Sequence, residues 1–502
     1  MTRLALNSFF LQIFCLLLIL TIGAGCEKGL TPRSYTDLTP ANFPKNEADL
    51  NTAVTGVYNK FRQQDRSRDF TAAYIIQKTS VLVNNLSTTD EFATDWAITP
   101  QMIFTLKPTD LFAEQFWSRA QPTITLATIT IEMVKAADYI SDKRKAALVS
   151  ELRCIRAIYA YDLYDEYGPV PIMTDPEIVS DLQKAQNYKP ARPSQQEYSG
   201  FLVKELTEAA LNLPTVTDNA DFGRMSKGIA LTCLLKLYMH DKQWAKAEAV
   251  SKEIIDLNYY MLQPNFKDIW AVNNENNKEI IWAIPYTGAS GFENTFHFAV
   301  LPGDFKSLSE GQTPVPIQSW GQGYKLPWPV WDSFDPSDKR REVFQRYYWN
   351  GKAMVDLKAS SSGAIPLKYP IDPNMTGAGS ATDFVIYRYA DVLLYRAEAL
   401  NELNGANAES LDIINRLRTR AGLDTLAAGN FNQSTLRAQI LKERQWELCF
   451  EGVRRQDLIR NGSFVSNALA RGRQFVQPFH VLFPIPQYAI NENPNIHQNT
   501  GY

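Results

Sequence analysis

The stretch LKERQWELCFEGVRRQDLIR, residues 441–460, decides the fold class of this chain. Read as a helix, it places Glu443, Glu447 and Glu451 in one row, because residues four positions apart share a helix face. Trp446 and Phe450 form a second row with the same spacing, which is typical of a face buried in a core. The stretch therefore predicts a packed amphipathic helix in a mainly helical protein.

Two further features of this stretch bear on its role. Its arginines, among them Arg444, Arg454 and Arg455, lie beside the glutamates and favour ion pairs over a catalytic role. Gly452 inside the helical pattern costs about 1 kcal/mol relative to alanine, which predicts a close helix–helix contact at that position.

The composition excludes some classes of function. The chain has 502 residues, a formal net charge of −3 and no basic run, which argues against nucleic acid as a partner. It contains 10 Trp, 23 Tyr and 26 Phe, enough to fill a core and still leave rings for an exposed stacking surface.

The N-terminus has the pattern of an export signal. Residues 9–22 form an apolar run that is short for a membrane span and suits a signal peptide. The sequence IGAGC follows at residues 22–26 and resembles the bacterial lipobox, in which the cysteine is acylated. We expect a signal peptide at residues 1–25, lipidation of Cys26 and a tether at residues 26–44.

The other cysteines and the histidines predict no metal or disulfide chemistry. Cys154, Cys233 and Cys449 lie in apolar helical patterns and form no C-x-x-C pair, so we expect buried thiols. The four histidines match no metal-binding spacing, and no cofactor is expected.

Apolar residues at helical spacing predict helices in both halves of the chain. The expected helices cover residues 46–63, 110–139, 142–167, 195–213, 227–240, 244–257, 385–400 and 407–421. Ser194 and Glu197 form a capping box at the start of one of them. The short turns between paired helices resemble tetratricopeptide repeats, although the period is irregular.

The polar loop at residues 82–100 lacks a helical period and carries Trp96. Two roles are open for this ring: a lid on the core, or a platform on which a sugar ring stacks through its apolar face. Asp90 and Asn85 of the same loop are candidates for hydrogen bonds to ligand hydroxyls, although either residue type also caps turns.

Between residues 264 and 382 the helical pattern disappears, apart from a strand-like run at residues 279–284. Long irregular segments in compact proteins are usually functional. Trp320 and Tyr324 lie in the part richest in glycine and proline, where a core role and a ligand-binding role are equally open. For Trp328 and Trp331, near an expected helix start, we favour a core role.

Several motifs occur in the order of one known family. They are RAIYAYDLYDEYGPVP at 156–171, RYADVLLYRAEA at 388–399, INRLRTRAGL at 414–423, ERQWELCFEGVRRQDL at 443–458, and PIPQ followed by NPNIHQNTGY at the end of the chain. Together they resemble the SusD/RagB-like family of Bacteroidetes outer-membrane nutrient-binding lipoproteins.

The resemblance implies a fold and a function. The fold is mainly α, with tetratricopeptide-like helical repeats on which a large loop-rich segment packs. A single domain would cover residues 45–502, with a helical half at 45–260, the loop-rich segment at 261–382 and a second helical half at 383–502. The function is to bind glycans or other oligomeric nutrients at the outer membrane, facing outward, and to deliver them to a TonB-dependent, SusC-like transporter.

Other functions remain open from the sequence. A peptide-binding member of the family is one, and a helical scaffold that binds only proteins is another. A glycoside hydrolase is less favoured, because it needs a carboxylate pair with one raised pKa, whereas arginines next to Glu443, Glu447 and Glu451 would hold these carboxylates ionised. For the ligand site we predict a platform of Trp96, Trp320 and Tyr324, because these rings lie in polar, non-periodic stretches where a core role is least required. The resemblance implies that the loop carrying Trp96 borders the ligand site.

Overall fold

Helices form most of the structure, a computed structural model that describes residues 43–62, 77–95, 98–216, 221–289, 293–316, 323–375, 377 and 379–502. The predicted signal peptide, Cys26, Trp96 and Trp320 lie outside these residues. Internal contacts divide the chain into Met1–Asp49 and Leu50–Tyr502, and the arrangement below is that of the second unit.

The N-terminal half contains the first group of helices. They are α2 (Glu47–Arg62), α3 (Gln77–Ser87), α4 (Pro100–Ile103), α5 (Leu111–Glu114), α6 (Trp117–Ala136), α7 (Asp142–Tyr167), α8 (Pro176–Val179), α9 (Leu182–Asn187), α10 (Gln195–Asn212), α11 (Lys227–His240) and α12 (Trp244–Asp256).

Local signals account for these helices. α2 buries Leu50, Val54, Val57 and Phe61, which are the stripe that its spacing predicts. The capping box that starts α10 is present as predicted. Two predictions are wrong in part: the helix expected at 110–139 is interrupted between α5 and α6, and α3 extends to Ser87 into the segment expected to be a loop.

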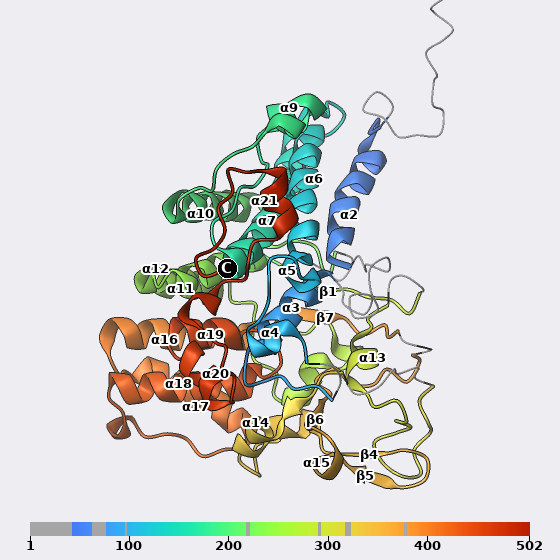
Figure 1. Cartoon of the computed structure of the whole chain (residues 1–502), viewed down its shortest axis with the longest axis vertical. Coiled ribbons are helices and arrows are strands. Elements are labelled where there is room, and N and C mark those ends of the chain that lie inside the picture. Colours follow the sequence, from blue (N-terminus) through green and yellow to red (C-terminus); the bar gives the residue numbers. More distant parts are fainter. Residues whose placement is uncertain are drawn as a thin grey trace, which may run out of the picture. The chain divides into compact units, whose positions relative to one another are not determined.

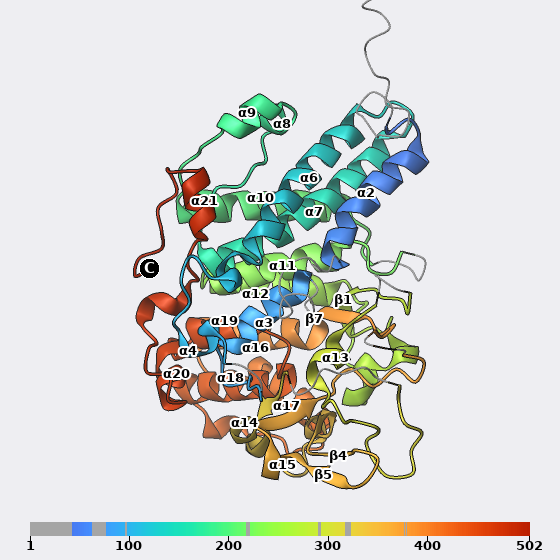
Figure 2. The same cartoon turned by 45° about the vertical axis from the view of Figure 1, so that its right-hand side comes forward.

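Neighbouring helices pack one after another, as Figures 1 and 2 show. α6 packs on α7, α7 on α10, α10 on α11 and α11 on α12. α12 then packs on α16 (Tyr389–Asn404), which contacts α17 (Ala408–Ala421) and α18 (Gln433–Leu448). The step from α12 to α16 joins the two halves into one array, so the predicted fold of tetratricopeptide-like repeats is confirmed.

The loop-rich segment contains short elements. They are β1 (Ile280–Ile284), α13 (Phe296–Val300), β2 (Leu326–Pro327), α14 (Trp328–Ser333), β3 (Phe344–Gln345), β4 (Tyr347–Trp349), β5 (Met354–Asp356), α15 (Leu357–Ser360) and β6 (Gly363–Pro366), with 3-10 turns between them. β2, β6 and β3 form one antiparallel sheet in that order, and β4 pairs with β5.

The start of the helix predicted at 385–400 is instead a strand. β7 (Phe384–Arg388) pairs antiparallel with β1, with Ile284 opposite Phe384, and α16 begins only at Tyr389. The apolar run had the right composition for either element, and the partner strand a hundred positions earlier decides between them.

The helix predicted at 441–460 is broken. α18 ends at Leu448 and α19 (Arg454–Arg460) begins after a turn in which Phe450 and Gly452 both have positive φ, 66° and 78°. Gly452 is therefore needed for its backbone conformation as well as for close packing, because a Cβ there would lie 2.8 Å from Cδ1 of Leu82 in α3.

Two other observations concern the described part of the chain. Cys154, Cys233 and Cys449 are buried thiols, as predicted. Among the helices that the structure describes, none is both long enough and apolar enough to cross a membrane.

Candidate functional site

Two segments that the sequence separates by more than 200 residues meet at the base of the predicted ligand platform. Ala93 and Lys325 form an antiparallel β-bridge, with backbone N–O distances of 3.0 and 2.9 Å. The ring of Phe92 lies 5.1 Å from that of Tyr324, measured between centroids. In the sequence, Trp96 follows Ala93 by three positions and Trp320 precedes Lys325 by five, and both tryptophans lie outside the described residues.

A third segment is tied to the same place. The Asp95 carboxylate accepts hydrogen bonds from the Ser361 hydroxyl and from the backbone N–H of Ser362, the latter at 2.6 Å. Both serines lie between α15 and β6, so three segments converge on what we call the joint, defined by residues 92–95, 323–325 and 361–362.

Tyr324 is the one aromatic residue of the predicted platform within the described residues. Its ring is half-buried and packs against the hydrophobic core, and burial raises the pKa of its hydroxyl well above the ordinary value. Its backbone N–H donates to the carbonyl of Ala299 at 3.0 Å. The structure therefore fixes Tyr324 at the joint, and its contact with a ligand stays a prediction.

A buried cation that the sequence did not indicate lies in the joint. Lys325 has no exposed surface, and its Nζ donates to the carbonyl of Val300 at 2.7 Å. Burial lowers the pKa of this ammonium group to about 8, although the nearby Asp95 carboxylate acts in the opposite direction.

Asp90, predicted to bond to a ligand, pairs with the protein itself, and Asn85, predicted to do the same, is buried. The Asp90 carboxylate accepts two hydrogen bonds from the Arg454 guanidinium, both at 2.9 Å, and one at 2.9 Å from Asn467. Burial tends to raise its pKa, but the hydrogen bonds and charge of Arg454 outweigh burial and lower it. Asn85 is 8% exposed on α3, and its Oδ1 has no hydrogen-bond partner among the described residues.

Trp328 and Trp331 are packed on the core, as predicted. Their indole N–H groups donate to the carbonyls of Ser361 and Phe344, at 2.8 and 3.2 Å. The Arg341 guanidinium lies 3.6 Å above the Trp331 ring, so a cation from the protein already occupies one face of that ring.

The glutamates of the opening stretch lie in a buried ionic network. Glu443 and Glu447 have no exposed surface, and Arg340 donates to both, at 2.7 and 3.4 Å. Arg388 connects Glu447 to Glu451, which lies in the turn beyond the end of α18. Burial raises the pKa of Glu443, whereas the surrounding arginines lower that of Glu447. A general acid needs a raised pKa together with access to substrate, and these carboxylates face arginines in the interior.

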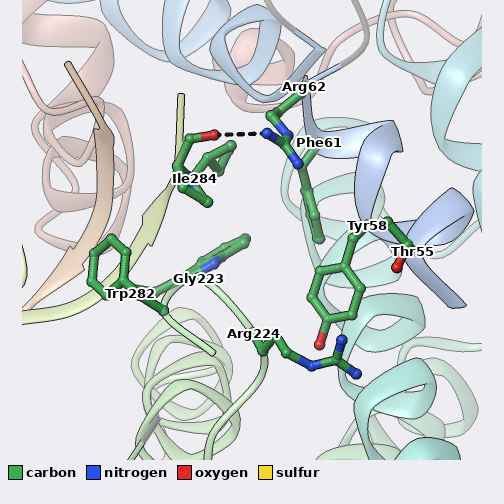
Figure 3. Close-up of a pocket in the computed structure, with 10 residues that line it drawn as sticks. Thr55, Tyr58, Phe61, Arg62, Gly223, Arg224, Trp282 and Ile284 are labelled. Atoms are coloured by element: carbon green, nitrogen blue, oxygen red, sulfur yellow. Dashed lines mark hydrogen bonds between the residues drawn. The ribbon is translucent and has the colours of Figure 1, made fainter. Parts of the chain in front are cut away.

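Two pockets lie elsewhere among the described residues. One of about 130 Å³ has Tyr58 and Phe61 of α2 on one side and Trp282 and Ile284 of β1 on the other (Figure 3). Arg224 lies beside the Tyr58 ring and pairs with Glu151 at 2.7 Å. The second, about 660 Å³, is an open groove between α6, α9 and α21 (Gln487–Glu492). None of the sequence-predicted site residues lines either pocket.

Within the described ranges, no three His, Cys, Asp or Glu side chains are grouped so as to hold a metal ion.

Comparison with known proteins shows which family this chain is similar to. The sequence pattern of the SusD family matches residues 318–502, which include the broken helix and the chain's last motif. A SusD-like protein of Formosa agariphila is 25% identical in an alignment 531 residues long, which covers 95% of this chain and 96% of that protein. These matches support the SusD/RagB-like family, which the motifs of the sequence resemble.

Further similar proteins are named for a glycan that they bind. The starch-binding protein SusD of Bacteroides thetaiotaomicron is 22% identical over 70% of this chain and 72% of its own length. A laminarin-binding SusD-like protein has a TM-score of 0.75 at 23% identity, covering 91% of this chain and all of that structure. Surface glycan-binding protein A of Bacteroides thetaiotaomicron, in complex with laminarihexaose, has a TM-score of 0.73 at 19% identity, over 90% of this chain and 99% of that structure. At these identities the two structures establish the SusD-like fold.

Proposed function

We propose that this protein is a non-catalytic surface lipoprotein that binds glycans and delivers them to a TonB-dependent, SusC-like transporter. The observation that supports the binding role is the joint, where residues 92–93 contact residues 324–325. Trp96 and Trp320 lie a few positions away from these residues in the sequence. Flat rings on neighbouring loops suit an extended oligosaccharide, because sugars present apolar C–H faces to aromatic rings. The relatives described as binding laminarin or starch support the same ligand class.

Calorimetry on the purified wild-type protein tests the ligand class. The panel is laminarihexaose, oligosaccharides from starch, and unrelated peptides, and we expect saturable heat from at least one glycan. Binding of peptides alone would replace the glycan by a peptide as ligand. No binding across the panel would contradict the proposed function for these ligand classes, and release of new reducing ends from the glycans would contradict the non-catalytic role.

Lipidation of Cys26 is the basis of the proposed location. Each buried methylene of an acyl chain contributes about 0.8 kcal/mol, so a multiply acylated cysteine holds a protein on a bilayer. We expect a fatty-acid probe to label the wild-type protein in cells and Cys26→Ala to lose the label. Equal labelling of the two would contradict the anchor. Protease treatment of intact cells tests whether the protein faces outward.

The transporter is the expected partner. We expect a pull-down from the native membrane in mild detergent to recover a large β-barrel protein together with this chain. Repeating it at several salt concentrations separates a broad specific interface from weak surface-charge attraction, which salt screens. Recovery of this chain alone under all conditions would count against the delivery role.

A further inference from the structure

The base of the predicted ligand loop is held by the C-terminal motif. Arg454, the first residue of α19, contacts both carboxylate oxygens of Asp90 at 2.9 Å. Asn467 of α20 (Phe464–Ala470) and Gln445 of α18 donate to the same carboxylate, at 2.9 and 3.2 Å. A bidentate contact of this kind fixes the orientation of the two side chains as well as their distance. Asp90 is thus held by three helices that lie more than 350 positions away in the sequence.

The next residue is held by the turn between α18 and α19. Glu91 has no exposed surface, and its Oε2 accepts the backbone N–H of Phe450 at 2.9 Å. Phe450 has a positive φ of 66°, which is strained for a bulky residue, so this turn is one that the surrounding structure must hold in place. Arg471 adds a hydrogen bond to the carbonyl of Thr88 at 2.8 Å.

These contacts end at Glu91, directly before the joint. Glu91 is followed by Phe92, whose ring contacts Tyr324, and by Ala93, which pairs with Lys325. A loop that is already ordered does not lose that conformational freedom when a ligand binds, whereas a loose loop must be ordered at the expense of affinity.

We infer that the turn at residues 449–453, together with Arg454, Asn467 and Arg471, clamps the loop at residues 88–95, and that Asp90 and Glu91 are positioning residues of the ligand site rather than ligand contacts. The expected effect on ligand affinity rests on the proposed function. The clamp itself concerns only how well residues 88–95 are ordered. It also gives the C-terminal motif a role beyond core packing, because the broken helix is the part that holds the loop.

The main variant is Arg454→Gln, and its matched control is Arg156→Gln. Arg156 makes a similarly buried pair with Glu205, at 2.6 Å, between α7 and α10, and neither residue contacts the joint. Arg454→Lys is the conservative variant, since lysine keeps the charge and loses the bidentate geometry. Two quantities are measured on folded protein: hydrogen-exchange protection of residues 88–95, and the Kd for laminarihexaose and for starch oligosaccharides.

We expect Arg454→Gln to lower the hydrogen-exchange protection of residues 88–95. It should also weaken glycan binding about tenfold or more, because the ligand would then have to order a few loop residues when it binds. Arg454→Lys should lie between it and the wild type. Arg156→Gln should lower stability while leaving both the loop protection and the Kd within about twofold of the wild type, since its ion pair lies outside the loop.

A second variant, Glu91→Gln, tests the other positioning residue by pH. Burial raises the pKa of Glu91 from 4.5 to about 8, so its carboxyl is protonated at neutral pH. The charged groups that face it are Asp90 on its own loop, Arg454 on α19 and Lys368 before β7, with the Cys449 thiol on the turn. Opening of the loop exposes Glu91 and lets it ionise near its ordinary pKa of 4.5, whereas burial and the Asp90 charge oppose its ionisation in the closed loop. Wild-type protection of residues 88–95 should therefore fall as the pH rises from about 5 to about 8, and level off above it. Glu91→Gln cannot ionise and should not show this fall.

The outcomes separate the clamp from the proposed function. Unchanged protection of residues 88–95 in Arg454→Gln overturns the clamp, whatever the affinity. Lower protection with an unchanged Kd overturns the positioning role. If the wild type binds neither glycan, the proposed function fails, and the clamp stands or falls on the exchange measurements and on the pH comparison with Glu91→Gln.

Discussion

Replacement of Glu447 by glutamine should lower the free energy of unfolding by about 3–5 kcal/mol, since removing one partner of a buried ion pair leaves the other charges uncompensated. Its Oε1 accepts hydrogen bonds from Arg388 and Arg420, at 2.6 and 2.5 Å, and Arg340 lies 3.4 Å from Oε2. A glutamine at this position would keep the shape of the side chain but would face three guanidinium groups without a negative charge. The loss is therefore electrostatic, with no cavity.

Chemical denaturation of the purified protein measures this loss. The control is Asp256→Asn, which removes the partner of Lys252 in an exposed pair on α12 at 2.6 Å. Exposed pairs contribute about 0–1 kcal/mol, so this variant should unfold nearly like the wild type. Glycan affinity per folded molecule should be unchanged in both variants. A Glu447→Gln protein as stable as the control would contradict the role of the network.

The Glu447 carboxylate should also make the stability of the protein depend on pH. Burial alone would raise the pKa of Glu447, but Arg420, Arg388 and Arg340 together lower it far below the ordinary 4.5. A carboxyl with a depressed pKa in the folded state stabilises the fold fully above its unfolded pKa and less as the pH falls below it. The difference in stability between wild type and Glu447→Gln should therefore be largest above about pH 5 and shrink in acid.

Removal of the predicted platform rings should have the largest effect on binding. Stacking on an aromatic side chain contributes about 1–3 kcal/mol per ring, by analogy with nucleobases, so Trp96→Ala and Trp320→Ala should each weaken glycan binding roughly 5- to 150-fold. The two effects should combine in the double variant if the rings contact separate sugar units. Calorimetry with laminarihexaose and starch oligosaccharides measures both.

The control for this experiment is Trp244→Ala, which removes a half-buried ring at the start of α12. It should lower stability and leave the Kd of folded molecules unchanged. If Trp96→Ala and Trp320→Ala stay folded and bind like the wild type, the site has been placed wrongly. If they lose peptide binding in a protein that binds no glycan, the platform stands and the ligand class changes.

Much of the fold could be predicted from the sequence, because helix signals are local. The stripe of α2 and the capping box of α10 involve residues within a few positions of each other, and the structure confirms both. The order of motifs along the chain also indicated the family correctly.

Elements whose conformation depends on distant partners were predicted wrongly. Residues 385–388 read as helix but form a strand, because β1 offers backbone hydrogen bonds to them. Residues 441–460 read as one helix, but Phe450 leaves the helical conformation where its N–H bonds to Glu91, 359 positions away. A pattern of apolar residues carries no signal for such a partner.

The candidate site could likewise be predicted only in part from the sequence. The sequence alone determined that Trp96, Trp320 and Tyr324 lie in polar, non-periodic segments, where a core role is least required. Only the tertiary structure decided that these segments meet, through the bridge of Ala93 with Lys325, and that Asp90 pairs with Arg454. Helices are fixed by contacts a few residues apart, whereas a site assembled from loops is fixed by backbone pairing and ion pairs between residues that become neighbours only after the helices have packed.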